Sequence, residues 1–283
     1  MLKQNLKRML VSATTCILML VSTCTVTLAE TQENFKENES VKYWAQKFPK
    51  FNEALEDGSL TGLVNTNTVY LKYDKDDTKN DCDLEGEIYT EDEYLYERNK
   101  KTFRTVISDF EKDGGKDPSW LRLDLQVYTT STPGTYMVYS YWEWKTKPAC
   151  TFTDINGIYV SSEMSIAPST PSTPKASCYI AYDSYGNEWY EENSIKSSQF
   201  GNGIASTIDL LGNSELFSYT NHMGMTQTPV KFTNSSSTSG VIYTNYVHSQ
   251  VALGTISFNQ KGQASFGLTI STDEHGGAIY IDR

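Results

Sequence analysis

The sequence predicts a mainly β protein, an antiparallel β-sandwich or open barrel, with a small helical part near its N-terminal end. Up to about residue 114 apolar residues recur at helical spacing, whereas from Trp120 onward they alternate with polar residues. A spacing of 3.6 residues is typical of amphipathic helices, and a spacing of two is typical of half-buried strands. Clusters of Gly, Asn, Ser and Pro separate the alternating stretches, which favours an antiparallel sandwich or barrel.

Three helices are expected in the first part of the chain. The first follows Ser40 as its cap, stops at Pro49, and carries the apolar stripe of Val41, Trp44, Ala45 and Phe48. A second, short helix covers about residues 51–57. The third covers about 91–112, because Thr90 and Glu93 have the spacing of a capping box.

Strands are expected over residues 64–73 and throughout the chain after residue 119. In the strand at 121–127 four apolar residues share one face, and Trp142 and Trp144 share one face of the next strand. Such alternation predicts that these faces line the core. The further strands predicted in this way are 157–163, 177–183, 204–211, 241–248, 252–258, 265–271 and 278–281.

Residues 1–29 have the layout of a secretory signal peptide. A cationic start is followed by the apolar run 9–21 and by the small-residue cleavage signal Thr27-Leu28-Ala29. Two alternatives stay open, lipidation at Cys24 as in a cell-surface lipoprotein, and an uncleaved anchor. The sequence therefore predicts a secreted protein with a signal peptide at 1–29, an N-terminal region with helices at 30–118 and a β-sandwich domain at 119–283.

The charge of the chain argues against nucleic acid as a partner. The formal net charge is −11, and removal of the signal peptide, which holds three basic and no acidic residues, makes it −14. A field of this sign repels phosphate backbones and anionic lipid surfaces. Contact with a membrane is expected only if the protein is a toxin.

Three cysteines remain after the predicted cleavage, at 82, 150 and 178. In an oxidising compartment the expected pair is Cys150 with Cys178, which closes a loop around a Pro/Ser/Thr-rich segment. Cys82 then stays free in an acidic run. The alternative is that all three are buried small apolar residues, because sequence alone does not establish connectivity.

No cofactor is predicted, and the metal signals are weak. The acidic run at 74–87 offers oxygen ligands that Ca²⁺ accepts, but it lacks the glycine and the terminal glutamate of an EF-hand loop. A solvated acidic loop is the favoured interpretation. The three histidines lie in separate segments without zinc-ligand spacing, and His248 is interpreted as a hydrogen-bonded sheet residue.

The only candidate binding residues are aromatic. The chain has no G-x-S-x-G elbow and no cysteine in a recognisable protease context, so no catalytic residue is assigned. Loops with exposed aromatic rings often carry binding sites. The candidates flank a Gly186-Asn187 turn and are Tyr182, Tyr185, Trp189 and Tyr190.

Three segments resemble motifs of uncharacterised secreted proteins of Gram-positive bacteria. They are Tyr139–Pro148, Thr153–Ile158 and Tyr246–Ser249, and the resemblance that they carry extends over about a third of the chain after the signal peptide. The resemblance implies an exported bacterial β protein and carries over no functional residue. The aromatic-rich strands and the missing catalytic motifs favour a secreted non-enzymatic protein that binds a protein or glycan ligand. The alternatives are a β-rich, membrane-active toxin or bacteriocin-like protein, and an extracellular hydrolase.

Overall fold

The computed structural model describes residues 35–73, 86–107, 118–148, 151, 153–212, 219–249, 256–266 and 272–283. Several sequence predictions fall outside these ranges. They concern the signal peptide, Cys24, Cys82, Cys150 and all of the acidic run except residues 86–87. No helix within the described ranges is both long and apolar enough to cross a membrane.

The N-terminal helices form where the apolar spacing predicts them. A 3₁₀ turn at Phe35–Glu37 precedes α2 (Glu39–Lys47) and α3 (Pro49–Glu56), and α4 spans Glu91–Ile107. The predicted cap of α2 is wrong, because the Asn38 side chain accepts from the backbone N–H of Ser40 at 2.9 Å. The capping box of α4 is confirmed, since the backbone N–H of Thr90 donates to the Glu93 carboxylate at 2.7 Å.

The remaining elements are antiparallel strands. They are β1 (Leu60–Tyr73), β2 (Glu87–Tyr89), β3 (Ser119–Thr130), β4 (Thr135–Trp144), β5 (Thr153–Val160), β6 (Met164–Ile166), β7 (Ala176–Asp183), β8 (Glu188–Glu192), β9 (Ile195–Ser197), β10 (Gly203–Asp209), β11 (Tyr219–Phe232), β12 (Ser239–Ser249), β13 (Ile256–Phe258), β14 (Ala264–Phe266), β15 (Thr272–His275) and β16 (Ala278–Asp282).

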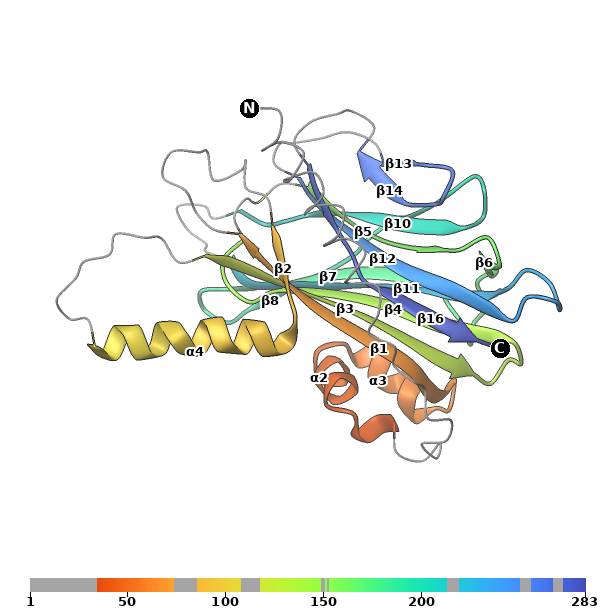
Figure 1. Ribbon diagram of the computed structural model, residues 1–283, viewed down its shortest axis with the longest axis horizontal. Helices are drawn as coiled ribbons and strands as arrows, with labels where there is room; N and C mark the ends of the chain where they lie inside the picture. Colours follow the sequence, from red (N-terminus) through yellow and green to blue (C-terminus); the bar gives the residue numbers. More distant parts are fainter. Residues whose placement is uncertain are drawn as a thin grey trace, which may run out of the picture.

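Two open sheets pack face to face as a sandwich (Figure 1). Sheet A has 8 strands, with the order β2-β1-β3-β4-β11-β7-β8 and β6 paired to β11. Sheet B has 6 strands, with the order β15-β12-β5-β10-β9 and β16 paired to β12. Neither sheet closes into a barrel, so the sandwich form of the prediction is the one confirmed.

Each outer face of the sandwich carries a further layer. Helices α2 and α3 lie on the outer face of sheet A (Figure 1). There Trp44 and Phe51 pack on Tyr139 and Tyr141. The β13–β14 hairpin covers part of the outer face of sheet B, where its Ala264 packs among apolar residues of the sheet. Each sheet is therefore buried on both faces where such a layer covers it.

The interior of the sandwich confirms the predicted alternation. Leu123, Leu125, Val138 and Trp142 are all buried between the sheets, and so is Trp144. A band of hydrogen-bonded polar side chains lies between two apolar clusters here. Its members are Ser140, Thr226 and Ser177 from sheet A and Asn156, Ser206 and Thr244 from sheet B.

This polar band fixes how the two sheets lie on each other. The Asn156 amide donates to the Thr226 hydroxyl at 3.1 Å, and the hydroxyls of Ser177 and Ser206 lie 2.7 Å apart. A sliding of one sheet over the other would leave these buried groups without partners, which costs about 1–3 kcal/mol for each group. The band thus favours one packing of the sheets over its neighbours.

Strand β11 is central in sheet A and was not predicted; its sequence contains Pro229 and many polar residues. Proline lacks the backbone N–H that a residue of a central strand donates to its neighbouring strand. Pro229 lies where the partner of β11 changes, since the pairing with β7 ends at Gln227 and the pairing with β6 begins at Val230. The polar side chain of Thr226 faces the polar band rather than solvent.

A buried acid fixes α2 on sheet A. The Asp124 carboxylate accepts from the Trp44 indole at 2.7 Å, from the Arg122 guanidinium at 2.9 Å and from the Ser40 hydroxyl. Arg122 also lies over the Tyr43 ring, 4.7 Å from its centroid. Buried charges are tolerated when they are paired and hydrogen-bonded, so this cluster explains how a charged pair survives beneath the helix.

Candidate functional site

The predicted aromatic residues lie at one end of sheet A, on the β7–β8 hairpin. β8 ends the strand order, so no strand of the described residues pairs with its outer edge. Each of its five residues is exposed. Three of the four candidate rings are exposed as well, Tyr185 at 78%, Trp189 at 46% and Tyr190 at 46%.

The hairpin turn is built by Asp183 and Gly186. The Asp183 carboxylate accepts from the backbone N–H groups of Tyr185 and Asn187, at 2.9 and 2.8 Å. Gly186 has a φ of 83°, a conformation that glycine adopts without strain. Hydrogen bonds from Asn187 lower the pKa of Asp183, so the carboxylate stays charged and holds the turn. The turn predicted at Gly186-Asn187 is present.

The four rings do not share one face. Trp189 lies opposite Ala181, on the side of the hairpin that faces sheet B, and Tyr190 lies opposite Ile180, on the side of the helices. Tyr182 is half-buried on the helix side and donates to Glu188 at 2.8 Å. Tyr185 projects from the turn. The hairpin therefore presents aromatic rings on both sides of one edge.

The same edge is strongly acidic. Three of the five residues of β8 are Glu188, Glu191 and Glu192. Lys50 of α3 pairs with Glu192 at 2.5 Å, and this contact lowers the pKa of Glu192 and raises that of Lys50. The pair is exposed and contributes little to stability. The edge thus carries excess negative charge beside its aromatic rings.

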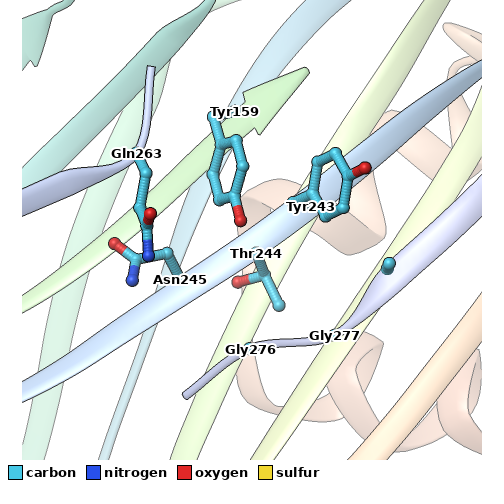
Figure 2. A pocket seen from close by; sticks show the side chains of 8 residues that line it. Tyr159, Tyr243, Thr244, Asn245, Gln263, Gly276 and Gly277 are labelled. Carbon is cyan, nitrogen blue, oxygen red and sulfur yellow. The ribbon is translucent and has the colours of Figure 1, made fainter. Parts of the chain in front are cut away.

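A second candidate site was not predicted and lies on the outer face of sheet B. It is a pocket of about 180 Å³ beside the β13–β14 hairpin. None of its lining residues is charged. They are Tyr159, Tyr243, Thr244, Asn245, Gln263, Gly276, Gly277 and Ala278 (Figure 2).

Strand register builds the aromatic side of this pocket. Tyr243 pairs with Tyr159 across β12 and β5, and the two rings stack with their centroids 4.6 Å apart and their planes 9° apart. Both are half-buried. Partial burial raises the pKa of Tyr243, so its hydroxyl is protonated near neutral pH and can donate a hydrogen bond.

Amide and backbone groups form the rest of the lining. Figure 2 shows the side chains of Asn245 and Gln263 together on one side of the pocket, with the two tyrosine rings on the other. Asn245 is 3% exposed, and its Oδ1 has no hydrogen-bond partner among the described residues. Gly276 passes so close to β12 that a Cβ there would lie 1.9 Å from the Thr244 carbonyl oxygen.

The alternation of apolar and polar residues could have predicted on which face of the sheet the two tyrosines lie. Ile158 and Val160 point inward, and so do Ile242 and Thr244, so Tyr159 and Tyr243 had to point outward. Sequence does not give the pairing partner of a strand or its register, and therefore the adjacency of the two rings was not predictable. The contribution of Gln263 depends on a separate hairpin folding over the sheet.

The buried histidines are structural. His248 Nδ1 lies 3.0 Å from the Asp154 carboxylate, which also accepts from the Tyr246 hydroxyl. His248 is 1% exposed, so the prediction of a hydrogen-bonded sheet residue is confirmed. His222 is 2.7 Å from the Tyr179 hydroxyl, and burial lowers its pKa, which keeps the ring neutral.

Cys178 is buried beneath α2 and α3 and forms no disulfide with any residue that the structure describes. Its predicted partner Cys150 lies outside the described residues, so the pairing stays a prediction. No group of three or more His, Cys, Asp or Glu side chains in the described ranges is placed to hold a metal ion. Of the acidic run considered for Ca²⁺, the described part is residues 86–87, and Glu87 lies in β2.

No protein-family model matches the chain, and no curated protein sequence does either. Solved structures that resemble parts of it include a pore-forming protein, with 10% identity and a TM-score of 0.28 over 58% of this chain and 87% of that one. The collagen-binding domain of a Staphylococcus aureus adhesin has 11% identity and a TM-score of 0.24 over 52% and 98%.

Clostridium perfringens delta-toxin has 9% identity and a TM-score of 0.27 over 60% of this chain and 86% of that one. At these TM-scores the likeness carries no conclusion about what this chain does. Just over half of this chain is thus similar to most of each of these solved chains, at low identity.

Proposed function

We propose that the chain is an exported, non-enzymatic binding protein that holds an extended, basic segment of a partner protein against the edge of β8. The observation that carries the proposal is that this edge strand has five exposed residues, among them three glutamates, Trp189 and Tyr190. A free edge offers unpaired backbone N–H and C=O groups, which an incoming strand can satisfy.

The residue composition of β8 favours an edge that binds a partner over an edge that only prevents unwanted strand pairing. Charged residues on an edge strand commonly prevent unwanted pairing, and glutamates alone would serve that purpose. Three exposed aromatic rings on the same hairpin work against it, because tryptophan and tyrosine are the residues that dominate binding energy at interfaces. An edge with both features repels acidic chains and attracts basic ones.

The negative charge of β8 determines which kind of strand can pair with it. A second copy of this chain would bring its own glutamates against Glu188 and Glu191, and like charges opposite each other destabilise a strand pair. Lys or Arg at alternate positions of a partner strand would instead face Glu188, which lies on the same side of β8 as Tyr190 and Glu192. The negative net charge of the chain adds long-range attraction for such a partner.

The test uses an array of ten-residue peptides in which Lys or Arg alternates with Val, Thr or Tyr. The strongest binder is measured by fluorescence anisotropy against the intact protein, at low and at high salt. We expect binding that weakens with salt, because the Debye length falls from about 10 Å at 0.1 M to about 3 Å at 1 M. The same peptide methylated at alternate backbone nitrogens should lose its affinity, since it cannot form a ladder.

Matched variants locate the contact. Trp189→Ala should weaken peptide binding by about fivefold or more, which corresponds to about 1 kcal/mol. Tyr96→Ala is the control, because Tyr96 is 66% exposed on α4, away from the hairpin. Equal binding of the methylated and unmethylated peptides would contradict strand addition. Dye release from liposomes by the protein alone would instead favour the membrane-active alternative.

A further inference from the structure

The pocket on the outer face of sheet B has a chemistry different from that of the β8 edge. In a chain with a net charge of −11, all eight of its lining residues are uncharged. A charged ligand would lose its hydration there without meeting a counter-charge in the lining. The pocket therefore favours a neutral ligand.

The stacked tyrosines give the pocket a flat, partly apolar wall. Tyr159 and Tyr243 hold each other face to face, so their rings are already ordered before any ligand arrives. An ordered ring loses little conformational freedom on binding, which favours affinity. A ligand with an apolar face of the size of one ring can pack against such a wall while its polar edges stay free to bond.

The side-chain amides opposite the tyrosine rings favour a ligand that carries hydroxyl groups. Asn245 has an acceptor oxygen and a donor nitrogen, and the Tyr243 hydroxyl can donate. The Gln263 side-chain oxygen accepts from the Asn259 amide at 3.1 Å and is thereby held in place beside the pocket. The Oδ1 of Asn245 is buried and has no hydrogen-bond partner among the described residues. Buried acceptors in native proteins are nearly always satisfied, so this one points to a donor supplied from outside. A purely apolar ligand would leave it unsatisfied.

We infer that this pocket binds one neutral hexopyranose ring of a saccharide. Such a ring has an apolar C–H face for the tyrosine wall and hydroxyls that both donate and accept along its edge. The volume of about 180 Å³ is below the range of about 300–1,000 Å³ of sites for drug-sized ligands and suits a single ring. The site is distinct from the β8 edge in place, charge and ligand.

The experiment uses methyl glycosides of glucose, galactose, mannose and N-acetylglucosamine, each alone and as the terminal unit of a trisaccharide. Saturation-transfer NMR detects binding, and titration of the ¹⁵N-labelled protein gives the dissociation constant. We expect at least one of the four to bind and to shift the backbone amides of Gly276 and Gly277. The trisaccharide arm distinguishes an isolated ring from the end of a longer glycan.

Three variants test the two sides of the pocket. Tyr243→Ala should weaken binding by about tenfold, whereas Tyr243→Phe, which keeps the stacked ring, should stay within about threefold of the parent. Gln263→Ala should weaken glycoside binding by about threefold. This variant replaces Tyr243→Ala in the test if Tyr243→Ala lowers the melting temperature of the protein. Tyr280→Ala is the control, because Tyr280 is 63% exposed on the same face of the sheet and does not line the pocket.

The outcomes separate this site from the other proposal. Trp189→Ala should leave glycoside binding unchanged even if it abolishes peptide binding. The inference is overturned if none of the glycosides binds at concentrations of about 50 mM, equivalent to less than about 2 kcal/mol of affinity. It is equally overturned if Tyr243→Ala binds as the parent does, or if methyl glucuronide or methyl glucosaminide binds more tightly than every neutral glycoside.

Discussion

The indole ring of Trp142 lies directly against the backbone of Gly224 on the neighbouring strand. The two residues pair in register across β4 and β11, and a Cβ at residue 224 would lie 2.5 Å from the ring. This glycine is therefore required by packing rather than by backbone conformation. The largest side chain of the sandwich interior fits because its neighbour has no side chain.

Gly224→Ala should accordingly destabilise the protein by overpacking, by about 1–3 kcal/mol. Denaturant unfolding followed by tryptophan fluorescence measures the change. Gly277→Ala is the matched control, since a Cβ there meets its nearest neighbour at an ordinary 3.5 Å. A free energy of unfolding equal to that of the parent for Gly224→Ala would show that Trp142 has room to move.

Leu125→Ala should cost about 2–4 kcal/mol, from lost transfer free energy together with the cavity left behind. Leu125 is fully buried between the sheets, within the apolar cluster that also contains Val127 and Val138. Chemical denaturation gives the value, and Leu95→Ala is the comparison, because Leu95 is 48% exposed on α4. A similar effect of both substitutions would argue against the packing described for the sandwich.

Asp124→Ala should release α2 from sheet A. It removes the acceptor of the Trp44 indole and leaves Arg122 buried without its partner, a loss that costs about 3–5 kcal/mol in buried pairs. Hydrogen exchange should accelerate over residues 39–56 before it does in β4 or β11. Glu39→Ala is the control, because the side chain of Glu39 is 93% exposed. Uniform acceleration across both sheets would contradict a local release.

Trp189→Ala should leave the melting temperature nearly unchanged, because surface substitutions away from packed features stay within about 0.5 kcal/mol. Its ring is 46% exposed on an edge strand. Differential scanning fluorimetry of the variant beside the parent checks this, together with the peptide titration. A clearly lowered melting point with unaltered peptide affinity would assign Trp189 to packing alone.

Cys178 should resist alkylation in the folded protein at pH 8 and react rapidly after unfolding without a reductant. Burial raises the pKa of its thiol from 9.0 to about 12, and the thiolate is the reactive form. Mass spectrometry after iodoacetamide treatment of native and unfolded samples measures the difference. Recovery of a Cys150–Cys178 peptide from exported protein would establish the predicted disulfide instead.

The raised pKa of Cys178 also makes the free energy of unfolding depend on pH, and the direction of this dependence follows from the shift. The folded state holds the thiol proton more tightly than the unfolded state does. The stabilising contribution is therefore fully present below about pH 9, and it declines as the pH rises through about 12. If Cys178→Ala flattens this alkaline decline relative to the parent, the thiol is its source. An unchanged decline would assign it to other groups.

The sequence by itself determined the class of fold and the inward face of most strands. Period two places Leu123 and Leu125 on one face of their strand, the face that lies between the sheets. The burial of Asp124 and Gln126 on the opposite face depends on the helices that cover it. The capping box at Thr90 likewise depends on residues three positions apart. These are local relations, so they were readable without a structure.

Only the tertiary structure decided which strands are neighbours. Pro229 is accommodated in a central strand because the partner of β11 changes at that position, and the polar side chain of Thr226 fits because it meets Asn156 of sheet B. Tyr159 and Tyr243 are separated by more than eighty residues in sequence, and their stacking follows from the register of β5 and β12. Pairing and register depend on contacts between distant segments, and period and capping carry no information about them.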